Sequence, residues 1–285
     1  MFKNSQQEDA FMAAYDRALQ LWPVPHETTY VPTKFGETHV VTSGNKDGKP
    51  LVLMPGAGDS STMWYANAEA LGAIYRIYAV DIVGDWGRSK IRSLPSTRQD
   101  LADWMVEIIN GLGIENPHMA GLSYGGFLTA NFACHYPELI DRIVLMAPAA
   151  TFRKLSPMFF VQALSAALLP FQSRVEGFLR WMIADGNEHD NAFHDQTVLS
   201  FGLGLPKLKV NPIVMSDTEL RGIENPTLLL VGDKEVIYDA TKVIERAKEL
   251  MPDVQAELVG HCGHHIPTER PEFVNQRILE FLDEA

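Results

Sequence analysis

The sequence has few cysteines, no long apolar run and no excess of positive charge. Its two cysteines, Cys134 and Cys262, are too few for a disulfide framework, which favours a reducing compartment. No run of about 18 apolar residues is present to span a membrane. Residues 1–16 also lack the apolar core of a signal peptide. We therefore expect a cytoplasmic protein that does not act at a membrane.

The chain carries 24 Lys and Arg residues against 36 Asp and Glu residues, which gives a formal net charge of −12. Nucleic-acid binding requires basic side chains that neutralise phosphates, and the sequence has no basic stripe. We therefore expect no nucleic-acid partner. Hydrophobic residues make up 46% of the 285 residues, which is enough to form one large core.

From about residue 38, short apolar runs alternate with helical patterns. Several runs are apolar on both faces, as in a parallel sheet that helices cover on both sides. The expected strands are 38–42, 51–54, 76–81, 117–120, 142–146, 227–231 and 255–259. The expected helices are one from a cap at Ser96 or Thr97 to Leu112, and those at 124–135, 240–250 and 271–282. This alternation predicts an α/β fold with a doubly wound, mostly parallel sheet.

Residues 150–224 break this alternation. They contain no strand pattern but have helix-like apolar segments at 159–169, 175–183 and 195–201. A stretch of about 75 residues exceeds an ordinary connection between strands. We expect an inserted helical cap there, although two surface crossover helices would also fit. The expected core then comprises 35–149 and 225–285, with a helical extension at 1–34.

Ser123 occurs in the run Gly121-Leu122-Ser123-Tyr124-Gly125, between an expected strand and an expected helix. A serine on so sharp a turn has a strained backbone that exposes its hydroxyl group. Small residues two positions before and after it prevent clashes. The pattern also arises by chance in glycine-rich turns, but its position between strand and helix predicts that Ser123 is a nucleophile.

A serine nucleophile requires a base, and His261, His264 and His265 follow the last expected strand. His264 follows a flexible glycine and precedes the helix expected from Pro271. We therefore predict His264 as the base and the other two histidines as its polar neighbours. A metal site would require differently spaced ligands and usually more cysteine, so we expect no metal.

A carboxylate is needed to orient the imidazole and to stabilise its charged form. The loop after the expected strand 227–231 contains Asp233, Glu235 and Asp239. The residues alone do not show which of the three reaches the histidine.

The run Pro55-Gly56-Ala57-Gly58 follows the expected strand 51–54. A glycine-rich turn here would direct the amide of Ala57 at an oxyanion, opposite the amide of Tyr124, although it would also fit an ordinary turn. Neither of the glycine-rich phosphate-binding motifs is present. We expect no cofactor.

Together these segments resemble the α/β-hydrolase superfamily from about residue 35 to 283. The runs that carry the resemblance are PGAG at 55–58, DIVGDWGRS at 81–89, GLSYGG at 121–126, GDKE at 232–235, GH at 263–264 and ERP at 269–271. The resemblance implies that the acid is Glu235, three residues after the glycine that ends its strand, with Asp233 and then Asp239 as alternatives. Many relatives have His-Gly where this chain has Pro55-Gly56, and more often Asp than Glu as the acid.

Haloalkane dehalogenases and epoxide hydrolases of this superfamily have Asp at the position of Ser123, so the resemblance is to the carboxylesterase branch. It implies hydrolysis of a carboxylic ester of a small or medium apolar substrate through an acyl-enzyme. Cleavage of a C–C bond, an amide or a lactone, or ligand binding without catalysis, are the alternatives. The residues expected to line an apolar pocket, which core packing would also explain, are Met63, Trp64, Trp86, Met158, Phe159 and Phe160.

Overall fold

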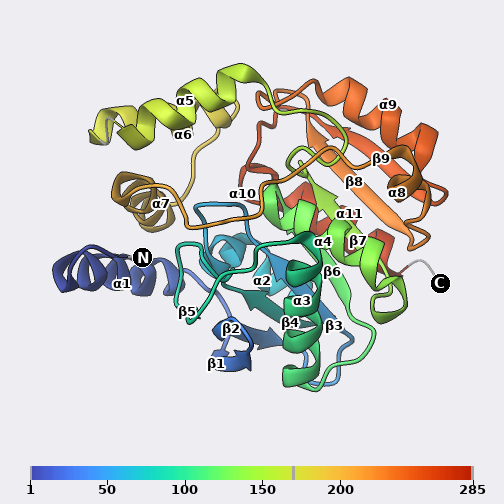
Figure 1. Ribbon diagram of the computed structural model, residues 1–285, viewed down its shortest axis with the longest axis horizontal. Coiled ribbons are helices and arrows are strands. Elements are labelled where there is room, and N and C mark those ends of the chain that lie inside the picture. Colours follow the sequence, from blue (N-terminus) through green and yellow to red (C-terminus); the bar gives the residue numbers. More distant parts are fainter. Residues whose placement is uncertain (1, 169–170, 284–285) are drawn as a thin grey trace.

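The computed structural model describes residues 2–168 and 171–283. Its strands are β1 (His26–Thr33), β2 (Gly36–Gly44), β3 (Pro50–Met54), β4 (Arg76–Val80), β5 (Lys90–Ile91), β6 (His118–Leu122), β7 (Ile143–Met146), β8 (Thr227–Gly232) and β9 (Val254–Val259). They form one sheet in the order β1-β2-β4-β3-β6-β7-β8-β9, with β5 beside β2 (Figure 1). The strands β4, β3, β6, β7, β8 and β9 run parallel to one another. Strand β2 is antiparallel to its three partners β1, β4 and β5. The predicted doubly wound, mostly parallel sheet is confirmed.

Helices cover both faces of the sheet. They are α1 (Ser5–Leu19), α2 (Ala68–Gly72), α3 (Arg98–Leu112), α4 (Tyr124–His135), α5 (Pro157–Leu168), α6 (Gln172–Met182), α7 (Asn191–Leu203), α8 (Asp217–Arg221), α9 (Ala240–Leu250), α10 (Ile266–Glu269) and α11 (Pro271–Asp283), with 3-10 turns η1 (Ser61–Ala66) and η2 (Pro137–Leu139). Val52 and Met54 pack with α3, α4 and α9, whereas Leu51 and Leu53 pack with α1, α2 and α11. Successive residues of a strand point to opposite faces, so an unbroken apolar run supplies both cores.

All seven expected strands are present, as β2, β3, β4 and β6 to β9. The expectation of a helical extension at 1–34 is wrong for its second half, because only α1 is helical and His26–Thr33 forms strand β1. This strand lies at the edge of the sheet and its first five residues are exposed. It therefore lacks the apolar alternation by which a half-buried strand is recognised, and it tolerates Pro32.

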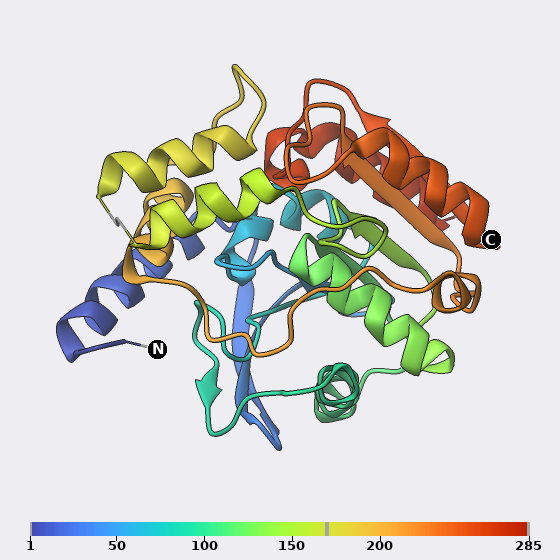
Figure 2. The same cartoon turned by 45° about the horizontal axis from the view of Figure 1, so that its top comes forward.

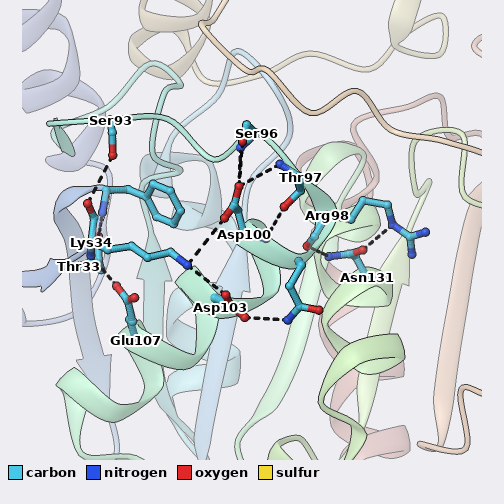
Figure 3. A network of polar contacts seen from close by, with 12 residues as sticks. Thr33, Lys34, Ser93, Ser96, Thr97, Arg98, Asp100, Asp103, Glu107 and Asn131 are labelled. Carbon is cyan, nitrogen blue, oxygen red and sulfur yellow. Dashed lines mark hydrogen bonds and ion pairs between the residues drawn. The ribbon is translucent and has the colours of Figure 1, made fainter.

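Helix α3 is tied to both of its neighbours by polar contacts (Figure 3). Thr97 caps its first turn, and Lys34 of the β1–β2 turn places its Nζ 3.0 Å from Asp103 Oδ2. On the other side, Asn131 of α4 donates a hydrogen bond of 2.9 Å to the carbonyl oxygen of Arg98. These contacts fix α3 against α4, the helix that begins directly after Ser123.

Of the helices between β7 and β8, α5, α6 and α7 stand apart from the sheet, whereas α8 lies beside α9 (Figures 1 and 2). The three helix-like segments expected there fall on α5, α6 and α7, except that Leu169 lies outside the described residues. No strand occurs in the described parts of 150–224. Helix α7 packs against α1 and α6, and α6 packs against α5. Within residues 2–168 and 171–283, no helix is both long enough and apolar enough to cross a membrane.

Candidate active site

Ser123 stands in the sharp turn between β6 and α4, with φ 52° and ψ −113°. A Cβ on Gly121 would lie 2.3 Å from the carbonyl oxygen of Gly125, and a Cβ on Gly125 would lie 2.2 Å from that of Met54. Both positions therefore require glycine. Tyr124 is the first residue of α4, so its amide has no acceptor within the helix and is free for a ligand.

The imidazole of His264 is oriented by Glu235. The distance from His264 Nδ1 to Glu235 Oε2 is 2.7 Å, and both side chains are buried. The other oxygen of this carboxylate accepts hydrogen bonds from the amides of Val236 and Ile237, at 2.7 and 2.9 Å. One carboxylate oxygen of Glu235 is thus held by the backbone, and the other bonds His264.

The two alternative acids do not reach His264. Asp233 accepts a hydrogen bond of 3.1 Å from the amide of Cys262. Asp239 caps α9 by accepting a hydrogen bond from the amide of Lys242. The sequence could not show which of the three carboxylates bonds His264, because all three follow β8 within a few residues and the direction of each side chain decides the contact.

Opposing effects set the pKa of His264. Burial favours the neutral imidazole and lowers the pKa, whereas the charge and hydrogen bond of Glu235 and the charges of Glu269 and Asp59 raise it. The raising contributions prevail, so the pKa lies above the usual value for histidine. A carboxylate that stabilises the imidazolium is what a proton-accepting histidine requires.

Glu269 holds the loop that carries His264. One carboxylate oxygen accepts hydrogen bonds of 2.9 Å from the amides of Ala184 and Gly263 and from the side chain of Asn187. The other accepts one of 3.0 Å from the amide of His265. This carboxylate therefore joins the histidine loop to the segment that follows α6. No role was predicted for Glu269 from the sequence, and the one available signal was its presence in the run 269–271.

The glycine-rich loop after β3 is supported by the run 81–89. Both oxygens of Asp85 lie 3.1 Å from the amide nitrogen of Gly58, and Asp81 accepts a hydrogen bond of 2.8 Å from the amide of Ser61. The backbone from Gly58 to Ser61 is thereby fixed at two points. Ala57 directly precedes this supported segment.

A cavity of about 340 Å³ brings Ser123, His264, Ala57 and Tyr124 together. The rest of its wall is mainly apolar and includes Phe159 and Phe160 of α5, Phe178 of α6 and Phe201 of α7. No Lys or Arg is among the residues that line it. A hollow of about 490 Å³ between α6 and α7 contains none of the predicted catalytic residues.

Four of the expected pocket residues do not line this cavity. Met63, Trp64 and Trp86 are buried in the core on the α1, α2 and α11 side of the sheet. Met158 is 52% exposed on the outer surface of α5. Those four predictions are wrong, because an apolar side chain beside the site can equally face the core or the solvent. The other two expected residues, Phe159 and Phe160, do line the cavity.

Asp59 also lines the cavity, and the sequence assigned it no role. Its burial raises the pKa of the carboxyl group to about 7, although a hydrogen bond from Thr197 and the charge of His264 act in the opposite direction. Within the described residues, no three His, Cys, Asp or Glu side chains gather as a metal-binding cluster.

Comparison with known proteins gives similarity over nearly the whole chain. A profile of the Alpha/beta hydrolase family matches residues 51–277. The uncharacterized carboxylesterase nap of Bacillus subtilis is 39% identical, over 96% of this chain and 92% of its own. Carboxylesterase YbfK of the same organism is 38% identical, over 95% and 93%. The crystal structure of naproxen esterase (carboxylesterase NP) from Bacillus subtilis matches with a TM-score of 0.92 at 38% identity, over 99% of this chain and 100% of that one.

Proposed function

Because the chain belongs to the α/β hydrolase family, we propose that it is a carboxylesterase that cleaves esters of small or medium apolar substrates through an acyl-enzyme. The observation that carries the proposal is the strained Ser123 in one cavity with the bonded pair His264 and Glu235. The similarity to carboxylesterases and to naproxen esterase supports ester chemistry.

Acylation begins when His264 accepts the hydroxyl proton of Ser123 through Nε2. The serine oxygen attacks the ester carbonyl carbon, and the resulting oxyanion accepts hydrogen bonds from the amides of Ala57 and Tyr124. The imidazolium, stabilised by Glu235, then gives its proton to the leaving alcohol. Water attacks the acyl-enzyme by the same route and releases the acid.

Helices α5, α6 and α7, which lie within the cap expected at residues 150–224, act in this proposal as a cap over the turn that carries Ser123. Each of them supplies a phenylalanine to the cavity wall. The amide of His264 donates a hydrogen bond of 2.7 Å to the carbonyl oxygen of Met182, at the end of α6. The cap therefore contacts the backbone of the base itself.

The cavity favours neutral apolar esters. Its volume lies at the lower end of the range of about 300–1,000 Å³ for small-molecule sites, which suits a short or medium acyl chain. Because no Lys or Arg lines it, a carboxylate on the substrate would be buried without a counter-charge. Anionic esters should be poor substrates.

The test is covalent labelling with a fluorophosphonate, followed by mass mapping of the modified residue. We expect labelling of Ser123 in the folded wild type, and a fall in esterase activity of at least about 10³-fold in Ser123→Ala with the melting temperature retained. Ser165→Ala changes a serine of α5 outside the cavity and should keep its activity. Labelling elsewhere, or full activity in Ser123→Ala, would contradict the proposed nucleophile.

The substrate class is tested with p-nitrophenyl esters of graded acyl length, beside lactones and amides. We expect the highest kcat/KM for a short or medium acyl ester. A lactone or amide with a higher kcat/KM than every ester would replace the proposed substrate class but leave the nucleophile in place. No turnover and no labelling would favour ligand binding without catalysis.

A further inference from the structure

Asp59 is a carboxyl group inside the proposed active-site cavity that the hydrolytic mechanism does not use. The residue is 5% exposed. Its Oδ2 lies 3.3 Å from the place that a Cβ on Gly56 would take, and Ser123 Cβ lies 3.5 Å from that same place. Both side chains therefore adjoin the backbone of Gly56, so the carboxyl group lies beside the site of reaction.

The position of Asp59 is fixed by contacts with α7. Thr197 Oγ1 of α7 lies 3.3 Å from Asp59 Oδ1. Next to it in α7, Gln196 donates a hydrogen bond to Ser60 and accepts one from Thr62, both at 2.8 Å. These contacts join the loop after β3 to α7, so the carboxyl group is held at a set place in the cavity wall.

The carboxyl group has unused capacity to accept hydrogen bonds. Among the residues that the structure describes, Thr197 is the one hydrogen-bond donor to it, and that hydroxyl also lies 3.1 Å from the carbonyl oxygen of Phe193. A hydroxyl has one proton to donate, whereas a carboxylate offers about four acceptor positions. Burial with so few donors is costly for the charged form, which agrees with the raised pKa of Asp59.

We propose that Asp59 determines specificity by accepting a hydrogen bond from a hydroxyl or ammonium group that the substrate carries close to its ester. The same carboxylate repels a substrate carboxylate at that place. This inference rests on the proposed ester hydrolysis. The cavity then has an apolar part, which the phenylalanines form, and a polar part, which Asp59 forms.

The experiment compares pairs of esters of matched shape at about pH 8, where a group with a pKa near 7 is mainly ionised. For the acyl side the pair is p-nitrophenyl β-hydroxybutyrate and p-nitrophenyl isovalerate, which exchange a hydroxyl for a methyl group. For the alcohol side the pair is hydroxyethyl butyrate and propyl butyrate. A third pair, p-nitrophenyl hemisuccinate and p-nitrophenyl valerate, measures the repulsion of a carboxylate.

The variants are Asp59→Leu, which removes the acceptor, and Asp59→Asn, which removes the charge. For each of the first two pairs, the quantity compared is kcat/KM of the ester with the hydroxyl group divided by that of the ester with the methyl group. In Asp59→Leu this ratio should fall about tenfold or more in at least one pair. In Asp59→Asn the ratio for hemisuccinate over valerate should rise about tenfold. Asp233→Asn, a change to a carboxylate outside the cavity, should alter none of these ratios.

A ratio measured within one variant does not depend on how much of that variant is folded. A purely structural role of Asp59 would lower both members of a pair equally. Wild-type turnover with all three ratios unchanged in both variants would overturn the inference and leave the esterase proposal intact. Wild-type protein that hydrolyses no ester would overturn the proposed function, and the inference with it.

Discussion

The two sides of the proposed active-site cavity are built differently. On the sheet side, the functional carboxylates are fixed by directed hydrogen bonds: Glu235 accepts two from amides and Glu269 accepts four. On the cap side, the run from Pro157 to Leu168 in α5 contains no charged residue, and Phe160 is 57% exposed although it lines the cavity. Directed bonds fix atoms to within tenths of an ångström, whereas apolar contacts fix shape and volume.

Helix α7 differs from α5 in how it joins the core. It lies in the proposed cap, yet Gln196 and Thr197 bond it to the loop after β3. Helix α5 makes ring contacts with its neighbour α6 instead, such as that of Phe159 with Phe178, whose centroids lie 6.2 Å apart. The comparison implies that changes to Glu235 or Glu269 alter the rate of reaction on every ester, whereas changes on α5, like those at Asp59, alter the choice among esters.

The largest effect is expected for Glu235→Gln. Because one oxygen of Glu235 accepts two amide hydrogen bonds, the amide oxygen of Gln would take that place and its NH₂ group would face His264. Nδ1 would then have to accept, which places the proton on Nε2 and prevents it from taking the proton of Ser123. We expect kcat to fall by about 10⁴-fold on short and long esters alike.

Asp233→Asn is the matched control, because it changes a carboxylate of the same loop that bonds Cys262 instead of His264. Its kcat should stay within about tenfold of wild type. If Asp233→Asn were the more damaging of the two, the choice of Glu235 as the acid would have to be given up.

A smaller, graded effect is expected from pH. His264 accepts a proton only when neutral. Burial lowers its pKa, but the charge and hydrogen bond of Glu235, together with the charges of Glu269 and Asp59, outweigh burial and raise it. The acid limb of kcat/KM should therefore have its midpoint above the usual histidine value of about 6.5, and activity should fall about tenfold for each pH unit below it. Melting temperatures across the same range separate this loss from acid unfolding. A midpoint at or below the usual value would show that the carboxylates around His264 do not outweigh the effect of its burial.

The sheet side was also the more predictable from sequence. Strands apolar on both faces and the small residues around Ser123 are local signals, so the doubly wound sheet and the turn were found in the right places. His264 was singled out for the same reason, since its glycine and the following helix are visible in the sequence. The choice of Glu235 over Asp233 depended on the family resemblance, because it rests on side-chain direction within one loop.

The remaining features depend on contacts between distant segments. Strand β1 was missed because an exposed edge strand has no buried face to mark it. Trp86 was expected in the pocket, yet it packs on Phe11 of α1 with ring centroids 5.7 Å apart. Asp59 went unnoticed because its burial is created by α7, more than a hundred residues further along the chain.

The smallest effect on activity is expected for a substitution on α5. Two adjacent residues of this helix differ in position, because one lines the cavity and the other lies on the surface. Phe159 lines the cavity, whereas its neighbour Met158 is 52% exposed outside it. Phe159→Ala removes part of the apolar wall and should lower kcat/KM for a medium acyl ester about fivefold to tenfold, with little change for p-nitrophenyl acetate. Met158→Ala should stay within about twofold on both esters. Equal losses on acetate and on the longer ester in Phe159→Ala would mean that α5 positions the catalytic groups, and the contrast between the two sides of the cavity would not hold.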